Sequence, residues 1–273
     1  MMGKVISINI QKGGVGKTTT AHELASNLTA LGYKVLAIDL DQQRNLSKTS
    51  GAAINAGYFT MYDVLERKCQ FEDAIQEIGE EGEEGIEINV LNYDIAPAHP
   101  EFKSADNHYS GWQDVLRLKE LINEQNLRDV YDYIIIDTPT SLGILPQMAL
   151  AAADYLVIPC SASSFTTQGL GALYKEIEDQ RRVGFSNVKI AGILLTKYGD
   201  RKVYEKAQKE TLEEHAEYMG TRVFNTYIRA AVSVEEAQHL NLSLIQHDPK
   251  AKPADDYRNF TLELLEIMKN DEE

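Results

Sequence analysis

Short apolar runs alternate along the chain with longer segments in which apolar side chains recur every three or four positions. An apolar run of this length predicts a buried strand, and the three-to-four recurrence predicts an amphipathic helix. The predicted strands cover 5–10, 34–38, 86–91, 133–137, 155–159 and 188–196, with a short one at 222–224. The predicted helices cover 71–78, 112–127, 143–153, 166–183, 201–219, 232–240 and 255–269, after a first helix that Gly32 stops.

Strands that are apolar on both faces and alternate with helices are typical of a parallel sheet covered on both sides. We therefore predict an α/β fold, with a doubly wound, mainly parallel sheet flanked by helices. Neither an internal repeat nor a linker interrupts the pattern, so residues 1–273 are expected to form a single domain. Residues 42–70 are predicted to hold a polar loop and short helices, 79–85 an acidic solvated loop, and 94–111 irregular structure.

A glycine-rich loop joins the first predicted strand to the first predicted helix. Glycines allow backbone N–H groups to close around phosphates, and the helix N-terminus adds the positive end of its dipole. A lysine in such a loop reaches the β and γ phosphates, and the following hydroxyl can bind Mg²⁺. The loop and its flanks read Gln11, Lys12, Gly13, Gly14, Val15, Gly16, Lys17, Thr18 and Thr19. We therefore predict that this loop forms a nucleotide triphosphate site with Mg²⁺. A plain glycine turn that joins the strand to the helix is the weaker interpretation.

Two aspartates follow predicted strands and extend this site. Asp41 comes just after the second strand, where open parallel sheets bind their ligands. Asp137 ends the run Tyr133–Asp137, which has the form of a Walker B strand that places one carboxylate by the Mg²⁺ shell. We therefore expect Asp41 near the γ-phosphate or the attacking water, and Thr18 and Asp137 at the metal.

Charge and cysteine content limit the possible environments. The net charge is −15, which argues against a uniformly basic surface but allows local basic patches. Cys69 and Cys160 form no CxxC motif or disulfide framework, so a reducing cytoplasm is expected. The N-terminus lacks the layout of a signal peptide, and the uncharged run 155–174 is too polar to span a bilayer.

Together these residues resemble ParA-type, Soj-like partition ATPases, which carry a deviant Walker A loop and are related to MinD. The usual P-loop glycine is replaced by Gln11, and Lys12 is a second lysine beside the glycines. After Asp41 the family pattern is Pro-Gln-Gly-Asn, which Gln43 and Asn45 match while Gln42 and Arg44 do not. The resemblance extends over nearly the whole chain through 39–43, 136–143, 194–196 and 228–237.

The resemblance implies an ATPase that forms a homodimer around MgATP. It implies that Lys12 crosses to the partner's nucleotide, that Asp41 supports hydrolysis, and that Asp137 holds the Mg²⁺ shell. Adenine is expected near 196–198 and 224–227. A lysine supplied in trans would make turnover depend on dimerisation, because phosphoryl transfer is catalysed by positioned cations.

The family also binds DNA non-specifically as an ATP dimer, and a ParB-like centromere-binding partner stimulates hydrolysis. Between 175 and 209 there are nine Lys or Arg against five Asp or Glu. Solvated helix faces would look the same, but these residues can contact phosphates. The candidates are Lys175, Arg181, Arg182, Arg201, Lys202, Lys206 and Lys209, with Arg229 nearer the C-terminus. The glycine loop begins at residue 12, which leaves no room before it for a helix-turn-helix domain, and we expect none. The resemblance implies a cytoplasmic, nucleoid-associated protein.

Rival functions on the same site remain open. A MinD-like membrane ATPase would need a basic amphipathic C-terminal helix, whereas residues 262–273 are acidic. An iron-sulfur ATPase would need cysteine ligands in a motif that neither cysteine provides. A nucleotide-gated scaffold that positions a protein cargo would differ from DNA partition in its cargo alone.

Overall fold

A seven-stranded sheet forms the centre of the computed structural model, which describes residues 2–55, 57–77, 93–141, 143–161, 167–199 and 203–271. Its strand order is β3-β4-β2-β5-β1-β6-β7, and the pairings are parallel except for β3 with β4. The strands are β1 (Lys4–Ile8), β2 (Val35–Asp39), β3 (Gln76–Glu77), β4 (Asp94–Ala96), β5 (Tyr133–Asp137), β6 (Tyr155–Ser161) and β7 (Lys189–Thr196). The predicted doubly wound, mainly parallel sheet is confirmed.

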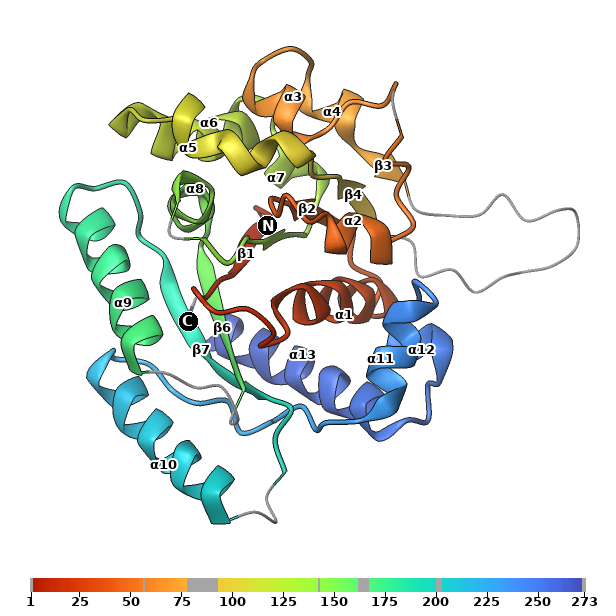
Figure 1. Cartoon of the computed structure of the whole chain (residues 1–273), viewed down its shortest axis with the longest axis vertical. Helices are drawn as coiled ribbons and strands as arrows, with labels where there is room; N and C mark the ends of the chain where they lie inside the picture. The colour runs from red at the N-terminus through yellow and green to blue at the C-terminus, as the bar shows by residue number, and fades with distance from the viewer. Residues whose placement is uncertain are drawn as a thin grey trace, which may run out of the picture.

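Helices cover both faces of this sheet (Figure 1). The α-helices are α1 (Lys17–Ala30), α2 (Asn45–Thr49), α3 (Met61–Leu65), α4 (Phe71–Ala74), α5 (Ala105–His108), α6 (Arg117–Glu124), α7 (Leu127–Val130), α8 (Ile144–Ala152), α9 (Thr167–Arg182), α10 (Val203–Tyr218), α11 (Val232–His239), α12 (Leu244–His247) and α13 (Lys252–Asn270). Two 3₁₀ helices, η1 (Pro100–Ser104) and η2 (Trp112–Leu116), complete the set.

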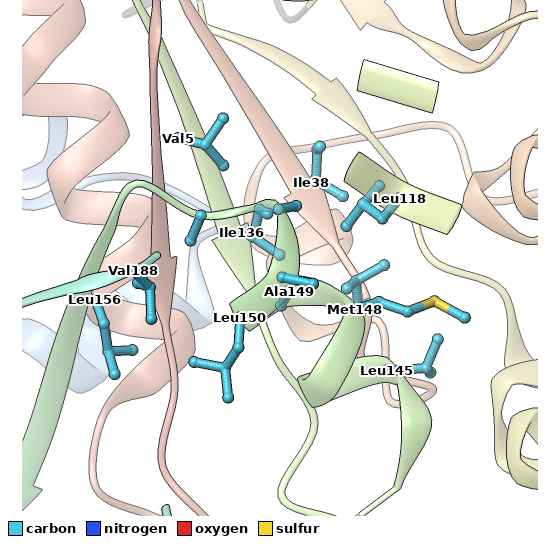
Figure 2. Close-up of a cluster of buried hydrophobic side chains, with 14 of the residues drawn as sticks. Val5, Ile38, Leu118, Ile136, Leu145, Met148, Ala149, Leu150, Leu156 and Val188 are labelled. Atoms are coloured by element: carbon cyan, nitrogen blue, oxygen red, sulfur yellow. The ribbon is translucent and has the colours of Figure 1, made fainter. Parts of the chain in front are cut away.

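The alternation of side chains along each strand divides the core into two clusters. On one face, strand residues such as Val5 and Ile136 pack under α6 and α8, where Leu118 and Met148 contribute (Figure 2). On the other face, Ile6, Ile8 and Ile135 pack with α1 and α13. Because both faces are covered, the central strands are almost continuously apolar in sequence. The carboxyl ends of β1, β2 and β5 are therefore fixed from both sides.

Several predicted boundaries are wrong. Residues 94–96 were expected to be irregular, but they form β4 beside β2. The predicted helix over 112–127 divides into η2 and α6, and the residue Asn126, with φ of 54°, separates α6 from α7. The predicted helix 71–78 is the shorter α4, followed by the edge strand β3. The predicted strand 86–91 and the acidic loop 79–85 lie outside the described residues.

The predicted strand at 222–224 is an extended segment that pairs with the outer edge of β7 without forming a named strand. Ile193 donates its N–H to Arg222 O at 2.8 Å, and Phe224 donates its own to Ile193 O at 3.0 Å. The pairing continues where Ile228 N–H donates to Leu195 O at 2.8 Å. This segment brings residues 228–231 to the carboxyl end of β7.

The buried carboxyl group of Glu23 gives α1 a pH-dependent stability. Burial raises the pKa of Glu23 from 4.5 to about 8, although its Oε1 accepts the Leu244 N–H at 2.9 Å. A carboxyl whose pKa is raised on folding contributes stability below the unfolded pKa, and that contribution is lost as the pH rises through the folded pKa. Its neighbour His22 has a pKa lowered by burial to about 4, so its contribution is lost as the pH falls below 6.5.

We therefore expect the free energy of unfolding to fall as the pH rises from 6.5 to about 8, because in this range the contribution of Glu23 changes with pH and that of His22 does not. Glu23→Gln keeps an acceptor for Leu244 and should flatten this slope, which urea unfolding at several pH values measures. Glu217→Gln, at an exposed position of α10, is the matched control and should leave the slope unchanged. A slope in Glu23→Gln as steep as the parent's would contradict the assignment; a shallower slope is expected to remain, because the pKa of the buried Asp137 is also raised.

Candidate functional site

A cleft of about 600 Å³ opens at the carboxyl end of the sheet, over the N-terminus of α1. The glycine loop and α1 form its floor, α2 one wall, and the segment after β7 with α11 the opposite wall. Its lining includes Gly14, Gly16, Lys17, Thr18, Thr19, Asp41, Asn45, Lys48, Thr49, Thr140, Thr196, Lys197, Ile228, Arg229, Ala230, Ala231, Val234, Glu235, Gln238, Asn241 and Tyr257. The sequence-predicted glycine loop, Asp41 and residues 196–197 therefore meet in one cavity.

The glycine loop has a backbone that requires glycine at two positions. Gly14 and Gly16 have φ of 75° and 88°, in the left-handed region where a side chain is unfavourable. Gly16 is also the residue that precedes the first turn of α1. The free N–H groups of that turn thus face the cleft together with the positive end of the helix dipole. This arrangement binds anions, and phosphate in particular.

Lys17 projects from the first turn of α1 and is 6% exposed. Its Nζ donates to the carbonyl oxygen of Lys12 at 3.0 Å. Burial lowers the pKa of Lys17, while the Asp137 and Asp41 carboxylates oppose that change. A cation is therefore held at the base of the cleft by the loop's own backbone.

The end of β7 holds the glycine loop from behind. Thr196 donates its hydroxyl to Val15 O at 2.7 Å, and Lys197 donates its Nζ to Gly14 O at 3.1 Å. These contacts join residues more than 180 positions apart in the chain, so the sheet itself fixes the loop carbonyls. Thr196 and Lys197 also line the cleft, so the end of β7 fixes the loop at the nucleotide site itself.

Asp39 and Asp137 end the neighbouring strands β2 and β5 and are paired in register. Asp39 is satisfied within the chain, because it accepts from the Asp41 N–H at 2.9 Å and from the Ser47 N–H and hydroxyl at 2.9 and 2.7 Å. Burial raises its pKa to about 6. These contacts fix the start of α2 and the loop that carries Asp41.

Asp137 is fully buried, and neither of its carboxylate oxygens has a hydrogen-bond partner among the described residues. Burial, and next the Asp39 carboxylate, raise the pKa of Asp137 well above its usual range. The Thr18 hydroxyl lies near enough to oppose that rise but forms no hydrogen bond of normal length and angle. An unsatisfied buried carboxylate beside a hydroxyl fits Mg²⁺, which commonly takes one or two protein oxygens and completes its shell with phosphates and water.

The second lysine of the loop, Lys12, lies outside the lining of the cleft. Lys12 is half-buried and is not among the described residues that line the cleft, whereas Lys17 lies within it. Val15 is buried beneath the loop, and Gly13 is exposed. Of the predicted phosphate-binding residues, Gly14, Gly16, Lys17, Thr18 and Thr19 line the cleft, and Lys12, Gly13 and Val15 do not.

Sequence reasoning missed several cleft residues. Asn45, Lys48 and Thr49 lie on one face of α2, a spacing that could have indicated a shared surface. On the opposite wall, Gln238 of α11 donates its Nε2 to the Thr19 hydroxyl at 2.6 Å. Adenine was expected near 196–198 and 224–227: Thr196 and Lys197 line the cleft, and on the other stretch the lining residues are 228–231, just after 224–227. The position of the adenine stays a prediction.

The proposed DNA-contacting residues lie mainly on α9 and α10, which run along the β7 edge of the molecule (Figure 1). Tyr174 and Tyr218 join these helices, with ring centroids 5.6 Å apart. Arg181, Arg182 and Lys209 pair with Glu178, Asp179 and Glu213 in exposed contacts that contribute little stability. Lys175 and Lys206 are exposed, and Arg201 and Lys202 lie outside the described residues.

Arg229 lies apart from α9 and α10, in the wall of the cleft. Asp256 of α13 accepts from its backbone N–H at 3.1 Å and from its Nε and Nη2 at 2.7 Å. Glu263, further along α13, accepts from the N–H groups of Asn225 and Thr226 at 2.7 and 2.9 Å. Two carboxylates of α13 therefore fix the wall that follows β7.

A strand, a glycine loop and a helix, with a buried aspartate at the end of the adjacent strand, define a P-loop nucleotide-binding protein. Among the described residues, no helix is long and apolar enough to cross a bilayer. The same part of the chain holds no cluster of three or more His, Cys, Asp or Glu suited to a metal.

Comparison with known proteins identifies the family. A family model described as an AAA domain matches residues 3–190. The chromosome-partitioning ATPase Soj of Treponema pallidum is 33% identical over 97% of this chain and 98% of its own, and the sporulation initiation inhibitor protein Soj of Bacillus subtilis is 32% identical over 96% and 98%. Cobyrinic acid a,c-diamide synthase of Mycobacterium smegmatis, solved with ADP and magnesium, shares the fold with a TM-score of 0.81, 24% identity and coverage of 98% and 96%. The chain belongs to the Soj/ParA family of ATPases.

Thr196→Val tests the support that β7 gives to the glycine loop. Loss of the hydroxyl removes one hydrogen bond to Val15 O, which we expect to weaken ATP binding by about threefold to tenfold. Calorimetric titration with ATP measures the effect. Thr261→Val is the control, because Thr261 is equally buried and donates to Tyr257 O within α13. Equal ATP affinities in the two variants would contradict a role for Thr196 in the loop.

Proposed function

We propose that the protein is a ParA-type ATPase that dimerises on MgATP, binds DNA non-specifically as a dimer, and partitions DNA with a ParB-like centromere-binding partner that stimulates hydrolysis. The observation that carries this proposal is the different placement of the two loop lysines. Lys17 is buried in the cleft, whereas Lys12 is half-buried and does not line it. A lysine so placed is available to the nucleotide of a second subunit.

The chain's own residues divide the chemistry of ATP hydrolysis among them. Residues 13–19 would bind the triphosphate through backbone N–H groups, and Lys17 would neutralise the β and γ phosphates. Thr18 and Asp137 would hold Mg²⁺, which neutralises charge on the phosphates when bound. Asp41 would orient or activate the attacking water, because Asp39 holds its backbone at the cleft wall.

Lys12 would complete the site in the second subunit. The attacking and leaving oxygens of phosphoryl transfer need positioned cations, and the lysine of a neighbouring subunit supplies one only after dimerisation. Hydrolysis in a monomer would then be slow. This dependence gives a partner protein a simple way to stimulate turnover, by stabilising the completed arrangement.

DNA binding is proposed for the face that α9 and α10 form. Lys175 and Lys206 are exposed there, and Arg182 and Lys209 can exchange their exposed carboxylate neighbours for phosphates at little cost. Arg181 is held more firmly, because it also donates to Val188 O at 2.6 Å. The overall charge of −15 opposes binding of a monomer. A dimer carries two such basic faces, and once one face has bound DNA the other is held close to the same DNA. Because dimerisation requires ATP in this proposal, DNA binding would then depend on ATP.

Lys12→Gln should separate dimerisation from nucleotide binding. We expect it to bind ATP with affinity within about threefold of the parent, since Lys12 does not line the cleft. It should fail to form the ATP dimer, which light scattering after gel filtration measures. Lys17→Gln provides the contrast and should lose nucleotide binding itself. An ATP dimer of Lys12→Gln as stable as the parent's would remove the trans-lysine role.

Binding to random-sequence duplex DNA tests the proposed function most directly. We expect binding with ATP and not with ADP, decreasing steeply with salt. Asp41→Ala, expected to bind ATP and hydrolyse it slowly, should hold the DNA-bound state longer. Lys175→Ala and Lys206→Ala should each reduce the slope of log K against log salt by about 0.9 per phosphate contact. Lys34→Ala, exposed elsewhere, is the control, and absence of ATP-dependent binding would contradict the proposal.

A further inference from the structure

Lys197 directly follows β7 and has a left-handed backbone, with φ of 52°. Its neighbours hold it there, because Thr196 donates its hydroxyl to Val15 O and Tyr198 donates its N–H to Ile228 O at 3.0 Å. A lysine is uncommon in this conformation, which persists where the surrounding structure imposes it. Both neighbours are buried, whereas Lys197 is exposed and lines the nucleotide cleft. The turn after β7 is therefore fixed on both sides of an accessible lysine.

The ammonium group of Lys197 lies on the glycine loop. Its Nζ donates to Gly14 O at 3.1 Å, and both residues line the cleft. An ammonium group has three N–H donors, and Gly14 O is the acceptor that the described part of the chain provides for them. Because this acceptor is neutral, the positive charge of Lys197 is not compensated at the loop.

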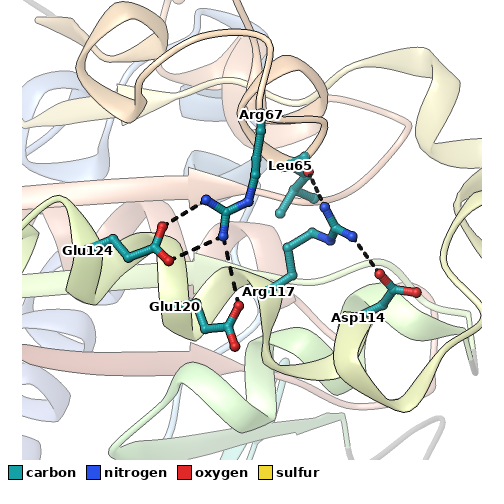
Figure 3. Close-up of polar contacts among 6 residues, drawn as sticks. All are labelled: Leu65, Arg67, Asp114, Arg117, Glu120 and Glu124. Atoms are coloured by element: carbon teal, nitrogen blue, oxygen red, sulfur yellow. Dashed lines mark hydrogen bonds and ion pairs between the residues drawn. The ribbon is translucent and has the colours of Figure 1, made fainter.

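Arg67 offers a comparison, because it has the same left-handed backbone, with φ of 55°. Its guanidinium group is held by two carboxylates, Glu124 at 2.8 Å and Glu120 at 3.9 Å (Figure 3). Lys197 forms no ion pair with any residue that the structure describes, although the net charge of the chain is −15. The charge of Lys197 is therefore available to an anionic ligand, whereas that of Arg67 is already paired.

The other cations that line the cleft are placed differently. Lys17 is buried beside the carboxylates at the base of the cleft, and Arg229 is paired with Asp256 at 2.7 Å. Lys48 is exposed, but its Nζ donates at 2.9 Å to a carbonyl of the loop after β2 rather than to the glycine loop. Lys197 thus combines exposure, an unpaired charge and a direct contact with the loop that binds phosphate.

We propose that Lys197 is a further phosphate-binding residue of the nucleotide site, and that its ammonium group passes from Gly14 O to the triphosphate when a nucleotide binds. A hydrogen bond from an ammonium group to phosphate is charge-assisted and roughly twice as strong as one between neutral groups. The flexible four-carbon stem of lysine lets the ammonium group turn while the backbone stays fixed. Thr196 continues to hold Val15 O, so the loop keeps a support from β7.

Lys197 would add a ligand to the nucleotide site, and this role rests on the proposed function for the identity of that ligand. It differs from a purely supporting role, in which the Nζ stays on Gly14 O. A support acts on the shape of the loop, so its loss would weaken ATP and ADP alike. A phosphate ligand acts through charge, so its loss would weaken ATP more than ADP, because the triphosphate carries more negative charge.

Calorimetric titration of the full-length protein with MgATP and with MgADP separates these roles. We expect Lys197→Met to weaken ATP binding about tenfold and ADP binding about threefold, so the ratio of the two dissociation constants changes about threefold. Both losses should be smaller at high ionic strength, because salt screens an exposed charge. Lys197→Arg keeps the charge and should retain the parental ratio.

Matched variants serve as controls. Lys119→Met removes a lysine outside the cleft whose Nζ also donates to a backbone carbonyl at 3.1 Å, and it should change neither affinity. Thr196→Val removes a support of the loop alone and should weaken both nucleotides by the same factor. Lys197→Gly suits the left-handed backbone and should give the same change of ratio as Lys197→Met, which tests the role even if the methionine perturbs folding.

Unchanged affinities in Lys197→Met and Lys197→Gly, or equal weakening of ATP and ADP, would overturn the inference. The same titrations on a Lys12→Gln background, expected to stay monomeric, remove any contribution of dimerisation. A change of ratio that disappears on that background would also overturn it, because Lys197 contacts the loop of its own subunit.

Failure of the proposed function has a different signature. Loss of ATP-dependent dimerisation or DNA binding would contradict the partition proposal and leave the change of ratio in Lys197→Met intact. A parent protein that binds neither nucleotide would refute the nucleotide site itself. A parent that binds both, with the same ratio in Lys197→Met, would refute the role of Lys197 alone.

Discussion

Two buried carboxylates side by side constrain the centre of this protein. Asp39 and Asp137 end adjacent strands in register, in a place where an unpaired charge is costly. The chain solves half of the problem internally, by giving Asp39 the N–H groups of Asp41 and Ser47 and the Ser47 hydroxyl. Asp137 has no hydrogen-bond partner of this kind among the described residues, which fits a bound cation. The position of α2, the course of the loop after β2 and the placement of Lys17 all follow from this division.

The glycine loop is likewise held by hydrogen bonds within the chain, and it is suited to anions rather than cations. Thr196 and Lys197 bind its carbonyls, so its N–H groups are available to phosphates. On the far side, Asp256 and Glu263 hold the segment that lines the cleft wall. The polar groups around the cleft are therefore positioned by elements that are packed into the core, which limits the reorganisation required when a nucleotide binds.

Sequence reasoning succeeded where the signal was local. The Tyr133–Asp137 strand and the glycine loop carry their own patterns, and the structure places both as expected. It failed where structure depends on distant partners, as for β4, whose three residues are a strand because β2 lies beside them. The break at Asn126 arises from one left-handed residue inside an amphipathic pattern. A second cavity joins residues from three separate stretches, 106–115, 141–147 and residue 185, which periodicity cannot bring together. The role of each site residue stays a prediction.

The sheet edges also bear on how the protein behaves at high concentration. An exposed strand edge offers unpaired backbone groups to other chains and promotes aggregation. One edge here is β3, only two residues long, and the other is β7, whose outer N–H and carbonyl groups at Ile193 and Leu195 are taken by residues 222–228. Neither edge is a good template for strand addition. Copies of the protein can therefore become locally crowded without their sheets joining into insoluble assemblies.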